Sequence, residues 1–344
     1  PTWYHRYLCG RLDAFARGEL KRLMVFAPPR HGKSQIVSRH LPAYLLGRNP
    51  DAQVIACSYS ADLAARNNRD VQRIIDTPAY AASFPDTRLW GKSVRTDGGG
   101  AWLRNSDLFE VVERKGSYRS AGRGQGISGM GGNHLIVDDL LKDRSEGDSP
   151  AVREACWEWY ASTFRTRLAP GGGILLTTTR FNTDDLPGRL LKLAAEDPKA
   201  DQWEVLSLPA ICRSSGDGMG SPRQVGDALW PERYPLTDLA KVRANSEYEW
   251  AALYQQEPRE RGSVEWPAEV FAGPGFWFDA WPDHLDIKVM ALDPSKGADA
   301  KTSDWQALIF YGRDSAGVEY VEADMGRRPV VAARGPDGTE LTDG

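Results

Sequence analysis

The run Leu23-Met24-Val25-Phe26 leads directly into Ala27-Pro28-Pro29-Arg30-His31-Gly32-Lys33-Ser34. Gly-Lys-Ser between a predicted strand and a predicted helix is typical of a phosphate-binding loop. In such a loop backbone N–H groups surround the phosphates, the lysine neutralises the β- and γ-phosphates, and the serine hydroxyl binds Mg²⁺. The usual pattern begins with glycine, and Ala27 stands at that place. We therefore predict nucleotide-binding residues from Pro29 to Ser34, and the remaining parts of such a site have to lie elsewhere in the chain.

The composition is that of an ordinary globular protein. The residues are 41% hydrophobic and 26% charged. A length of 344 residues is enough for one large domain and a smaller second one. A net charge of -4 gives no overall basic field, so any contact with nucleic acid has to come from local patches. The four cysteines form no Cys-x-x-Cys pair, which argues against structural zinc and favours a reducing cytoplasm. There is no apolar run of membrane length and no signal peptide, and because the chain begins with Pro1 we expect a mature form or a fragment.

Apolar runs alternate with helical patterns, which predicts an α/β fold with a mainly parallel sheet flanked by helices. The predicted strands are Leu23–Phe26, Gln53–Ser58, Trp102–Arg104, Phe109–Glu113, Leu135–Val137 and Ile174–Thr179. The predicted helices run from Lys33 to about Leu46 with a kink at Pro42, from Ser60 to Ile75, from Pro150 to about Phe164, and from Asp184 through Leu193. Pro170–Gly173 is predicted to be a break and Gly116–Gly132 a glycine-rich stretch.

The composition changes after residue 212. Ser214–Asp227 is polar and rich in turn residues, Leu236–Gln256 has a helical pattern, and Glu257–Asp283 is rich in proline, tryptophan and glycine. Three strand-like runs then follow in close succession, which favours an antiparallel meander: Ile287–Asp293, Trp305–Tyr311 and Val318–Asp324. We predict one domain over residues 1–212, a loop, helical segment and linker over 213–285, and a further region over 286–344.

A second part of a nucleotide-hydrolysing site is an apolar strand that ends in acidic residues, and His134-Leu135-Ile136-Val137-Asp138-Asp139 supplies one. In such a strand Asp138 would reach Mg²⁺ and Asp139 would polarise the attacking water. Many motors carry glutamate at the second position, so the shorter Asp139 is a departure. The alternative is a strand-end turn or helix cap, the commoner role of such a pair. The phosphate-binding loop upstream favours the catalytic interpretation.

A third part is Thr177-Thr178-Thr179-Arg180, at the end of another buried strand. Hydroxyl groups beside a phosphate site can sense the γ-phosphate and transmit its loss to the rest of the domain. The alternative is that threonine simply favours strands.

These motifs and several further stretches resemble the large terminase subunit of tailed bacteriophages, the motor that packages DNA into a procapsid. The resemblance covers almost the whole chain in the family's order. It is carried by Arg22–Ser34, Gly124–Gly132 with Leu135–Asp139, Leu140–Asp143, Trp157–Pro170, Thr177–Leu190 and Tyr248–Pro258. A proline-rich loop without the leading glycine, and Asp-Asp in place of Asp-Glu, are variations that this family shows.

The resemblance implies a P-loop ATPase domain over residues 1–212, of the additional-strand type related to recombination and helicase motors. By motif position Lys33 and Ser34 bind phosphate and Mg²⁺. Asp138 is the metal-side carboxylate and Asp139 the catalytic acid, while Thr177–Arg180 form the coupling motif.

The resemblance also directs attention to arginines and to the adenine contact. Arg30 is the candidate for an arginine that reaches the γ-phosphate. Arg119 and Arg123 are candidates for an arginine supplied to a neighbouring subunit, with a solvated loop charge or a DNA phosphate contact as alternatives. Tyr4-His5-Arg6 lies in the region where relatives contact adenine, although their glutamine is missing.

For residues 286–344 the resemblance implies the start of a ribonuclease H-like nuclease domain, which would use Mg²⁺ or Mn²⁺ held by carboxylates. Asp293 matches the first metal ligand. Asp304 is expected to be a neighbour of that site or a structural residue, and Asp324 a surface carboxylate. Few residues remain for the other ligands, so we expect an incomplete nuclease, through truncation, gene splitting or degeneration.

The resulting expectation is an ATP- and Mg²⁺-dependent motor subunit that translocates double-stranded DNA in the host bacterial cytoplasm. The implied partners are the portal protein and the small terminase subunit, with a homo-oligomeric ring and no membrane. Two alternatives remain open: another P-loop DNA translocase or helicase, and a degenerate prophage remnant that only binds partners.

Overall fold

The computed structural model describes residues 2–91, 102–127, 129–214, 221–259, 276–293 and 306–326. The chain divides into two units, Pro1–Glu265 and Trp266–Gly344, and each has its own sheet. None of the described helices is long and apolar enough to cross a membrane.

The first unit is built on a seven-stranded sheet. Its strands are β1 (Arg22–Phe26), β2 (Gln53–Ser58), β3 (Leu108–Glu110), β4 (Ser117–Gly122), β5 (Gly132–Asp138), β6 (Leu168–Thr177) and β7 (Glu204–Ser207). They lie in the order β3-β4-β2-β5-β6-β1-β7, and every neighbouring pair is parallel except β3 with β4. The prediction of a mainly parallel sheet is therefore confirmed.

Helical segments connect and cover these strands. They are α1 (Trp3–Ala16), the π-helical η1 (Gln35–His40), α2 (Leu41–Arg48), α3 (Ala61–Ile75), α4 (Pro78–Ser83), α5 (Arg144–Asp148), α6 (Pro150–Trp159), the π-helical η2 (Tyr160–Phe164), the 3₁₀ turn η3 (Arg165–Arg167), α7 (Leu186–Glu196), α8 (Leu236–Asn245), α9 (Glu247–Glu249) and the π-helical η5 (Trp250–Tyr254). Pro42 lies at the start of α2, directly after the π-helical turns, which is where the kink was predicted.

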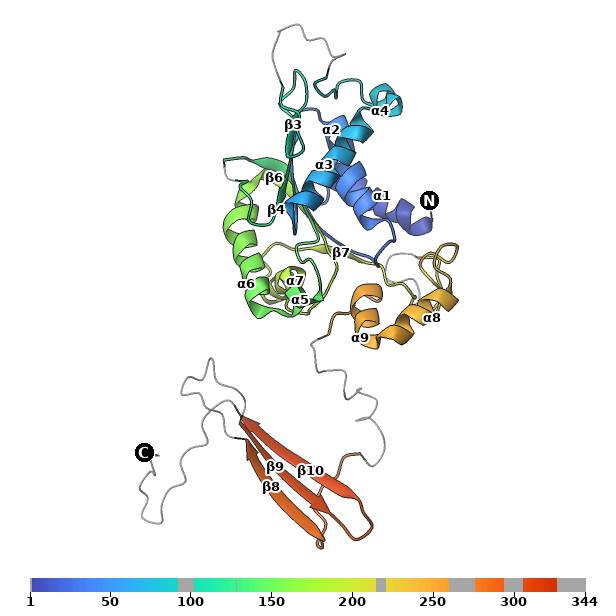
Figure 1. The fold of residues 1–344 in the computed structure, drawn as a ribbon, viewed down its shortest axis with the longest axis vertical. Helices are drawn as coiled ribbons and strands as arrows, with labels where there is room; N and C mark the ends of the chain where they lie inside the picture. Colours follow the sequence, from blue (N-terminus) through green and yellow to red (C-terminus); the bar gives the residue numbers. More distant parts are fainter. Residues whose placement is uncertain are drawn as a thin grey trace, which may run out of the picture. The chain divides into compact units, whose positions relative to one another are not determined.

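The central strands are apolar on both faces because helices cover both faces (Figure 1). Along β1, Leu23 and Val25 join a core with α1, α2 and α3, whereas Met24 and Phe26 join a second core with α6 and α7. Side chains of a strand alternate between faces, so one five-residue strand contributes to both cores.

The strand order brings three chain segments to one edge of the sheet. β6 lies between β1 and β5, with Thr177 paired to Val25 on one side and to Asp138 on the other. The carboxyl ends of the three parallel strands are therefore level with one another. In open α/β sheets ligands bind at this edge.

Several elements differ from the sequence predictions. α1, β4 and β7 were not predicted, and of Trp102–Arg104 only Arg104 forms an isolated bridge, with Phe109. β6 begins at Leu168, so Pro170–Gly173 lies inside the strand, where the pairing with β5 shifts register and Gly171 has φ 79°. The glycines form an irregularity in the strand rather than a break before it.

The segment after β7 packs against the rest of the first unit. Leu239 of α8 and Trp250 of η5 form a buried cluster with Ala210 and Ala228. The side chain of Gln255 bonds to both the N–H and the carbonyl of Ile211. The helical pattern predicted over Leu236–Gln256 is present as α8, α9 and η5.

The second unit contains an antiparallel meander, as predicted. Its strands β8 (Ile287–Asp293), β9 (Gln306–Arg313) and β10 (Glu319–Gly326) pair in the order β10-β9-β8. The side chain of Asp293 and the whole of Asp304 lie outside the described part of the chain, whereas Asp324 is exposed on β10. Four large apolar side chains of β8 are exposed: Ile287, Val289, Met290 and Leu292.

Candidate nucleotide-hydrolysis site

The loop after β1 has an unusual backbone. Arg30 and Gly32 both lie in the left-handed region, with φ 65° and 87°. Glycine adopts this conformation easily, but a residue with a side chain loses about 1–2 kcal/mol there. The loop conformation therefore depends on the contacts that surround it.

Three aromatic side chains supply those contacts. The hydroxyl of Tyr4 donates a hydrogen bond to the carbonyl of His31 (3.0 Å), and that of Tyr234 donates to the carbonyl of Arg30 (3.2 Å). The His31 ring is 1% exposed and stacks on Tyr234, with centroids 4.4 Å apart. Its Nδ1 lies 2.9 Å from the Pro29 carbonyl and so carries the proton. Burial lowers the pKa of His31, which keeps the ring neutral.

The structure brings the predicted lysine, serine and two aspartates together. Lys33 Nζ lies 3.3 Å from Asp139 Oδ1, and Ser34 Oγ donates to Asp138 Oδ1 at 3.3 Å. Ser38 Oγ donates to the other oxygen of Asp138. Ser38 was not predicted, although it lies four residues after Ser34 and hence on the same face of the helix.

Asp138 is the buried member of the acidic pair, with 4% of its surface exposed. Burial raises its pKa, and the neighbouring carboxylate of Asp139 adds to this; Lys33 and the two serine hydroxyls act in the opposite direction. A buried carboxylate beside a serine hydroxyl offers the hard oxygen donors that Mg²⁺ prefers. These residues therefore fit a magnesium ion.

Asp139 is fixed through its main chain and its side chain. Its N–H donates to the carbonyl of Thr177 (2.9 Å), and its carbonyl accepts from the N–H of Tyr59 (2.7 Å). Its Oδ1 accepts from the N–H of Thr179 (2.6 Å). The segment after β2 thus holds the main chain of Asp139, and the segment after β6 holds its carboxylate.

The hydroxyls of the threonine run bond to the main chain. Thr177 Oγ1 donates to the carbonyl of Val25 (3.2 Å), and Thr178 Oγ1 donates to that of Thr179 (3.3 Å). The contact with the carboxylate of Asp139 comes from the Thr179 N–H, which the sequence pattern did not indicate.

Arg180 continues this strand end into a buried ion pair. Its Nε lies 2.7 Å from Asp185 Oδ2, and its guanidinium lies over the Phe26 ring at 5.0 Å. Asp185 also caps α7 by accepting from the N–H of Gly188 (2.9 Å). Burial raises the pKa of Asp185, and Arg180 opposes that rise.

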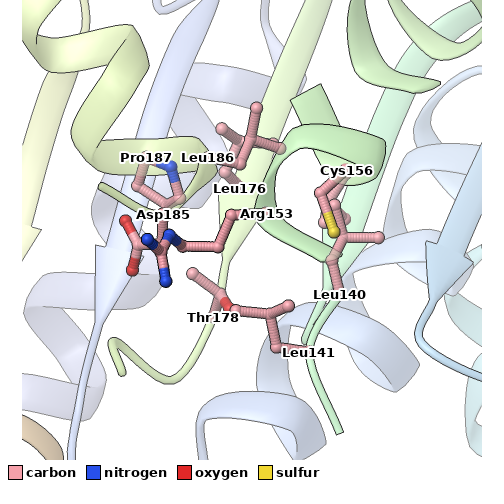
Figure 2. Close-up of a pocket in the computed structure, with 10 residues that line it drawn as sticks. Leu140, Leu141, Arg153, Cys156, Leu176, Thr178, Asp185, Leu186 and Pro187 are labelled. Carbon is pink, nitrogen blue, oxygen red and sulfur yellow. The ribbon is translucent and has the colours of Figure 1, made fainter. Parts of the chain in front are cut away.

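A small pocket lies behind the acidic strand, and Figure 2 shows Asp185 and Arg153 on one side of it with Cys156 and Leu140 on the other. Its volume is about 10 Å³. A space of that size holds at most one water molecule, so this pocket is a packing gap and not a ligand site.

The candidate arginines occupy different settings. Arg30 is exposed. Arg119 donates to the carbonyl of Gly126 (3.2 Å), and Arg123 bonds to Cys156 Sγ and lies 3.6 Å from Glu146. Arg119 and Arg123 are thus engaged within their own chain.

The N-terminal residues of α1 also approach the loop. Tyr4 is buried, and its hydroxyl donates a hydrogen bond to the carbonyl of His31. Arg6 lines a cavity of about 780 Å³ together with Trp3 and Trp230. The centroid of the Trp230 ring lies 6.3 Å from that of the His31 ring, which places this cavity next to the phosphate-binding loop.

Comparisons with known proteins give one family match and several similar solved structures. Residues 24–217 match the family model described as terminase large subunit, T4likevirus-type, N-terminal. The ATPase domain of the Thermus phage P74-26 large terminase, in a mutant form, shares 14% identity with a TM-score of 0.44, covering 72% of this chain and 92% of that one. The large terminase of a second thermophilic bacteriophage, solved in complex with ADP, shares 8% identity with a TM-score of 0.40, covering 92% of this chain and 68% of that one. No curated protein matches the chain in sequence.

Proposed function

This chain belongs to the terminase large subunit family of the T4likevirus type, and on that basis we propose that it is the ATP-hydrolysing motor subunit that moves double-stranded DNA into a procapsid. One observation carries the proposal. Lys33 forms an ion pair with Asp139, and Ser34 donates a hydrogen bond to Asp138, at the carboxyl edge of the sheet. A lysine, a hydroxyl and two carboxylates at this edge are the side chains that phosphoryl transfer requires.

The loop from Pro29 to Ser34 receives the phosphates. Backbone N–H groups at the start of the helix have no partner within the helix, so they are free to bond phosphate oxygens. The Lys33 ammonium neutralises charge on the β- and γ-phosphates. Arg30 is an exposed residue of this loop and is the arginine of this chain proposed to reach the γ-phosphate.

Ser34 and Asp138 are the residues that would hold Mg²⁺, which when bound would neutralise charge on the phosphate oxygens. Asp139 accepts a hydrogen bond from the water that attacks the γ-phosphate and so orients it. The hydrogen bond from the Thr179 N–H holds this carboxylate in its orientation.

The coupling motif transmits the loss of the γ-phosphate. Thr177–Arg180 touches Asp139 at one end and Asp185 at the other. A small displacement of Asp139 is thereby passed through Arg180 to the first turn of α7. We assign the base of ATP to the cavity lined by Trp3, Arg6 and Trp230, because two indole rings beside the loop provide a stacking surface.

The remaining assignments follow from the family. The ATPase domain is residues 1–212, joined through 213–285 to the start of a ribonuclease H-like domain over 286–344, in which Asp293 would be a ligand for Mg²⁺ or Mn²⁺. Several copies form a ring with the portal protein and the small terminase subunit in the host cytoplasm. Arg119 or Arg123 serves a neighbouring subunit. DNA is gripped through its phosphates, so binding weakens steeply with salt.

The test is ATP hydrolysis by the full chain with and without double-stranded DNA, together with a strand-displacement assay on a forked duplex. The expected result is Mg²⁺-dependent turnover without separation of the strands. Strand separation would identify a helicase instead. An absence of turnover would leave a protein that only binds partners.

A further inference from the structure

The segment that follows the sheet, residues 221–259, reaches the phosphate-binding loop through Tyr234. The Tyr234 hydroxyl donates to the carbonyl of Arg30 at 3.2 Å, and its ring stacks on His31 with an interplanar angle of 23°. We call this contact the His31–Tyr234 clamp. Its two residues lie about two hundred positions apart, so the contact belongs to the tertiary fold and not to the loop itself.

The clamp acts on the strained part of the loop. Arg30 holds a positive φ, and its carbonyl is the group that Tyr234 bonds. The next carbonyl, that of His31, is bonded by Tyr4. A carbonyl tied to a tyrosine hydroxyl cannot turn toward bound phosphate, whose negative oxygens would repel it. The two hydroxyls thus help to keep the loop in a form that presents N–H groups to the phosphates.

The His31 ring connects the clamp to the first half of the loop. It is 1% exposed, and its Nδ1–H donates to the carbonyl of Pro29. The ring is therefore fixed on its edge by Pro29 and on its face by Tyr234. Removing the Tyr234 ring exposes one face of His31 and frees the Arg30 carbonyl at the same time.

We infer that Tyr234 is a positioning residue for ATP binding, which acts through His31 and Arg30 to hold the phosphate-binding loop in its receptive form. This inference rests on the proposed ATPase function. The loop touches the phosphates both before and during hydrolysis. Loss of order in the loop therefore weakens the binding of the substrate and of the transition state alike. A change of that kind raises KM and leaves kcat nearly unchanged.

The experiment uses the full chain and four proteins: wild type, Tyr234→Phe, Tyr234→Ala and the control Tyr44→Phe. The control also loses a tyrosine hydroxyl, which donates to Asp13 and accepts from Arg48, away from the loop. The dissociation constant of a fluorescent ATP analogue with Mg²⁺, the steady-state KM and kcat for ATP, and the circular-dichroism melting curve are measured for each.

Tyr234→Phe keeps the stacked ring and loses one hydrogen bond, so affinity should fall about fivefold. Tyr234→Ala also loses the ring, and roughly a thirtyfold loss is expected. Tyr44→Phe should bind ATP as wild type does. A merely structural role for Tyr234 would lower the melting temperature without this ordered series and without a selective rise in KM.

A double-mutant cycle with His31→Ala tests whether Tyr234 acts through His31. If Tyr234 acts through His31, the losses from the two alanine variants are less than additive. Additive losses would overturn the clamp, as would wild-type affinity in Tyr234→Ala or an equal loss in Tyr44→Phe. A wild-type protein that does not bind the analogue would overturn the proposed function and this inference with it. Normal binding by wild type and Tyr234→Ala alike would remove only this inference.

Discussion

The ammonium nitrogen of Lys33 lies 3.3 Å from Oδ1 of Asp139 and joins the loop after β1 to the end of β5, across the intervening strand β6. The Lys33 side chain is 8% exposed and that of Asp139 25%, so the pair is partly shielded from water. A triphosphate at this loop competes with Asp139 for the same ammonium group. Nucleotide binding is therefore expected to loosen the pair and to release the carboxylate toward water.

Replacing Lys33 with alanine should reduce ATP turnover roughly 100-fold or more, because the ammonium is the main positive charge on the transferred phosphoryl group. The fold should persist, since Lys33 belongs to neither hydrophobic core. Turnover and the circular-dichroism spectrum are compared with those of Lys192→Ala, which removes an exposed lysine of α7. Unchanged turnover in Lys33→Ala would show that the site is elsewhere.

Asp139→Asn should bind ATP but hydrolyse it about 100-fold or more slowly, because the amide accepts a proton from water poorly. Binding of a fluorescent ATP analogue and single-turnover hydrolysis separate the two effects. Asp62→Asn, at the exposed start of α3, is the control. Full activity in Asp139→Asn would point to another base.

The Arg180–Asp185 pair should matter strongly for stability. Asp185→Ala leaves a buried guanidinium without its partner and removes the cap of α7, so the free energy of unfolding should fall by about 3–5 kcal/mol. The neighbouring Asp184→Ala removes two ion pairs of a half-exposed carboxylate, with Arg153 and Arg189, and should cost about 0–1 kcal/mol for each pair. Urea denaturation of both variants measures the difference. Similar losses in the two variants would contradict the importance of burial at Asp185.

His134 should make the protein sensitive to acid. Burial beside Phe15 lowers the pKa of His134 to about 4, against 6.5 for an ordinary histidine. Between these values the unfolded chain binds a proton that the folded chain does not, so stability falls as pH drops through this window, by up to about 3 kcal/mol. His134→Phe should therefore flatten the loss of stability between pH 6.5 and pH 4.

Urea midpoints at about pH 7 and about pH 5 measure that slope, with the exposed His40→Phe as control. Part of the slope should remain in His134→Phe, because burial also lowers the pKa values of His5 and His31. An identical pH dependence in wild type and His134→Phe would show that His134 is not responsible.

The strands that could be predicted contain a run of apolar residues or an alternation of apolar and polar residues. β2 was predicted with its observed ends, whereas β4 was missed because its sequence SYRSAG contains few apolar residues. It is buried because small residues let the chain come close: a Cβ at Gly122 would lie 2.5 Å from the N atom of Ala61. Close backbone contact of that kind leaves no hydrophobic period in the sequence.

The residues of the site also divide into those that could be predicted from the sequence and those that could not. Lys33, Ser34, Asp138 and Asp139 belong to short local motifs, so the sequence places them without a structure. Tyr234 belongs to no motif and acquires its role only when distant segments pack together. Two residues about two hundred positions apart form no motif that a single sequence could reveal.

The backbone of Asp139 bears on the choice of acid at the end of β5. Its φ of 49° is a conformation that aspartate and asparagine adopt more readily than other side-chain-bearing residues, because their short polar groups bond to nearby main chain. A glutamate would extend its carboxylate past the Thr179 N–H that now anchors it. Replacing Asp139 with glutamate would therefore require two changes at once: a longer side chain and a different backbone conformation in the turn after β5.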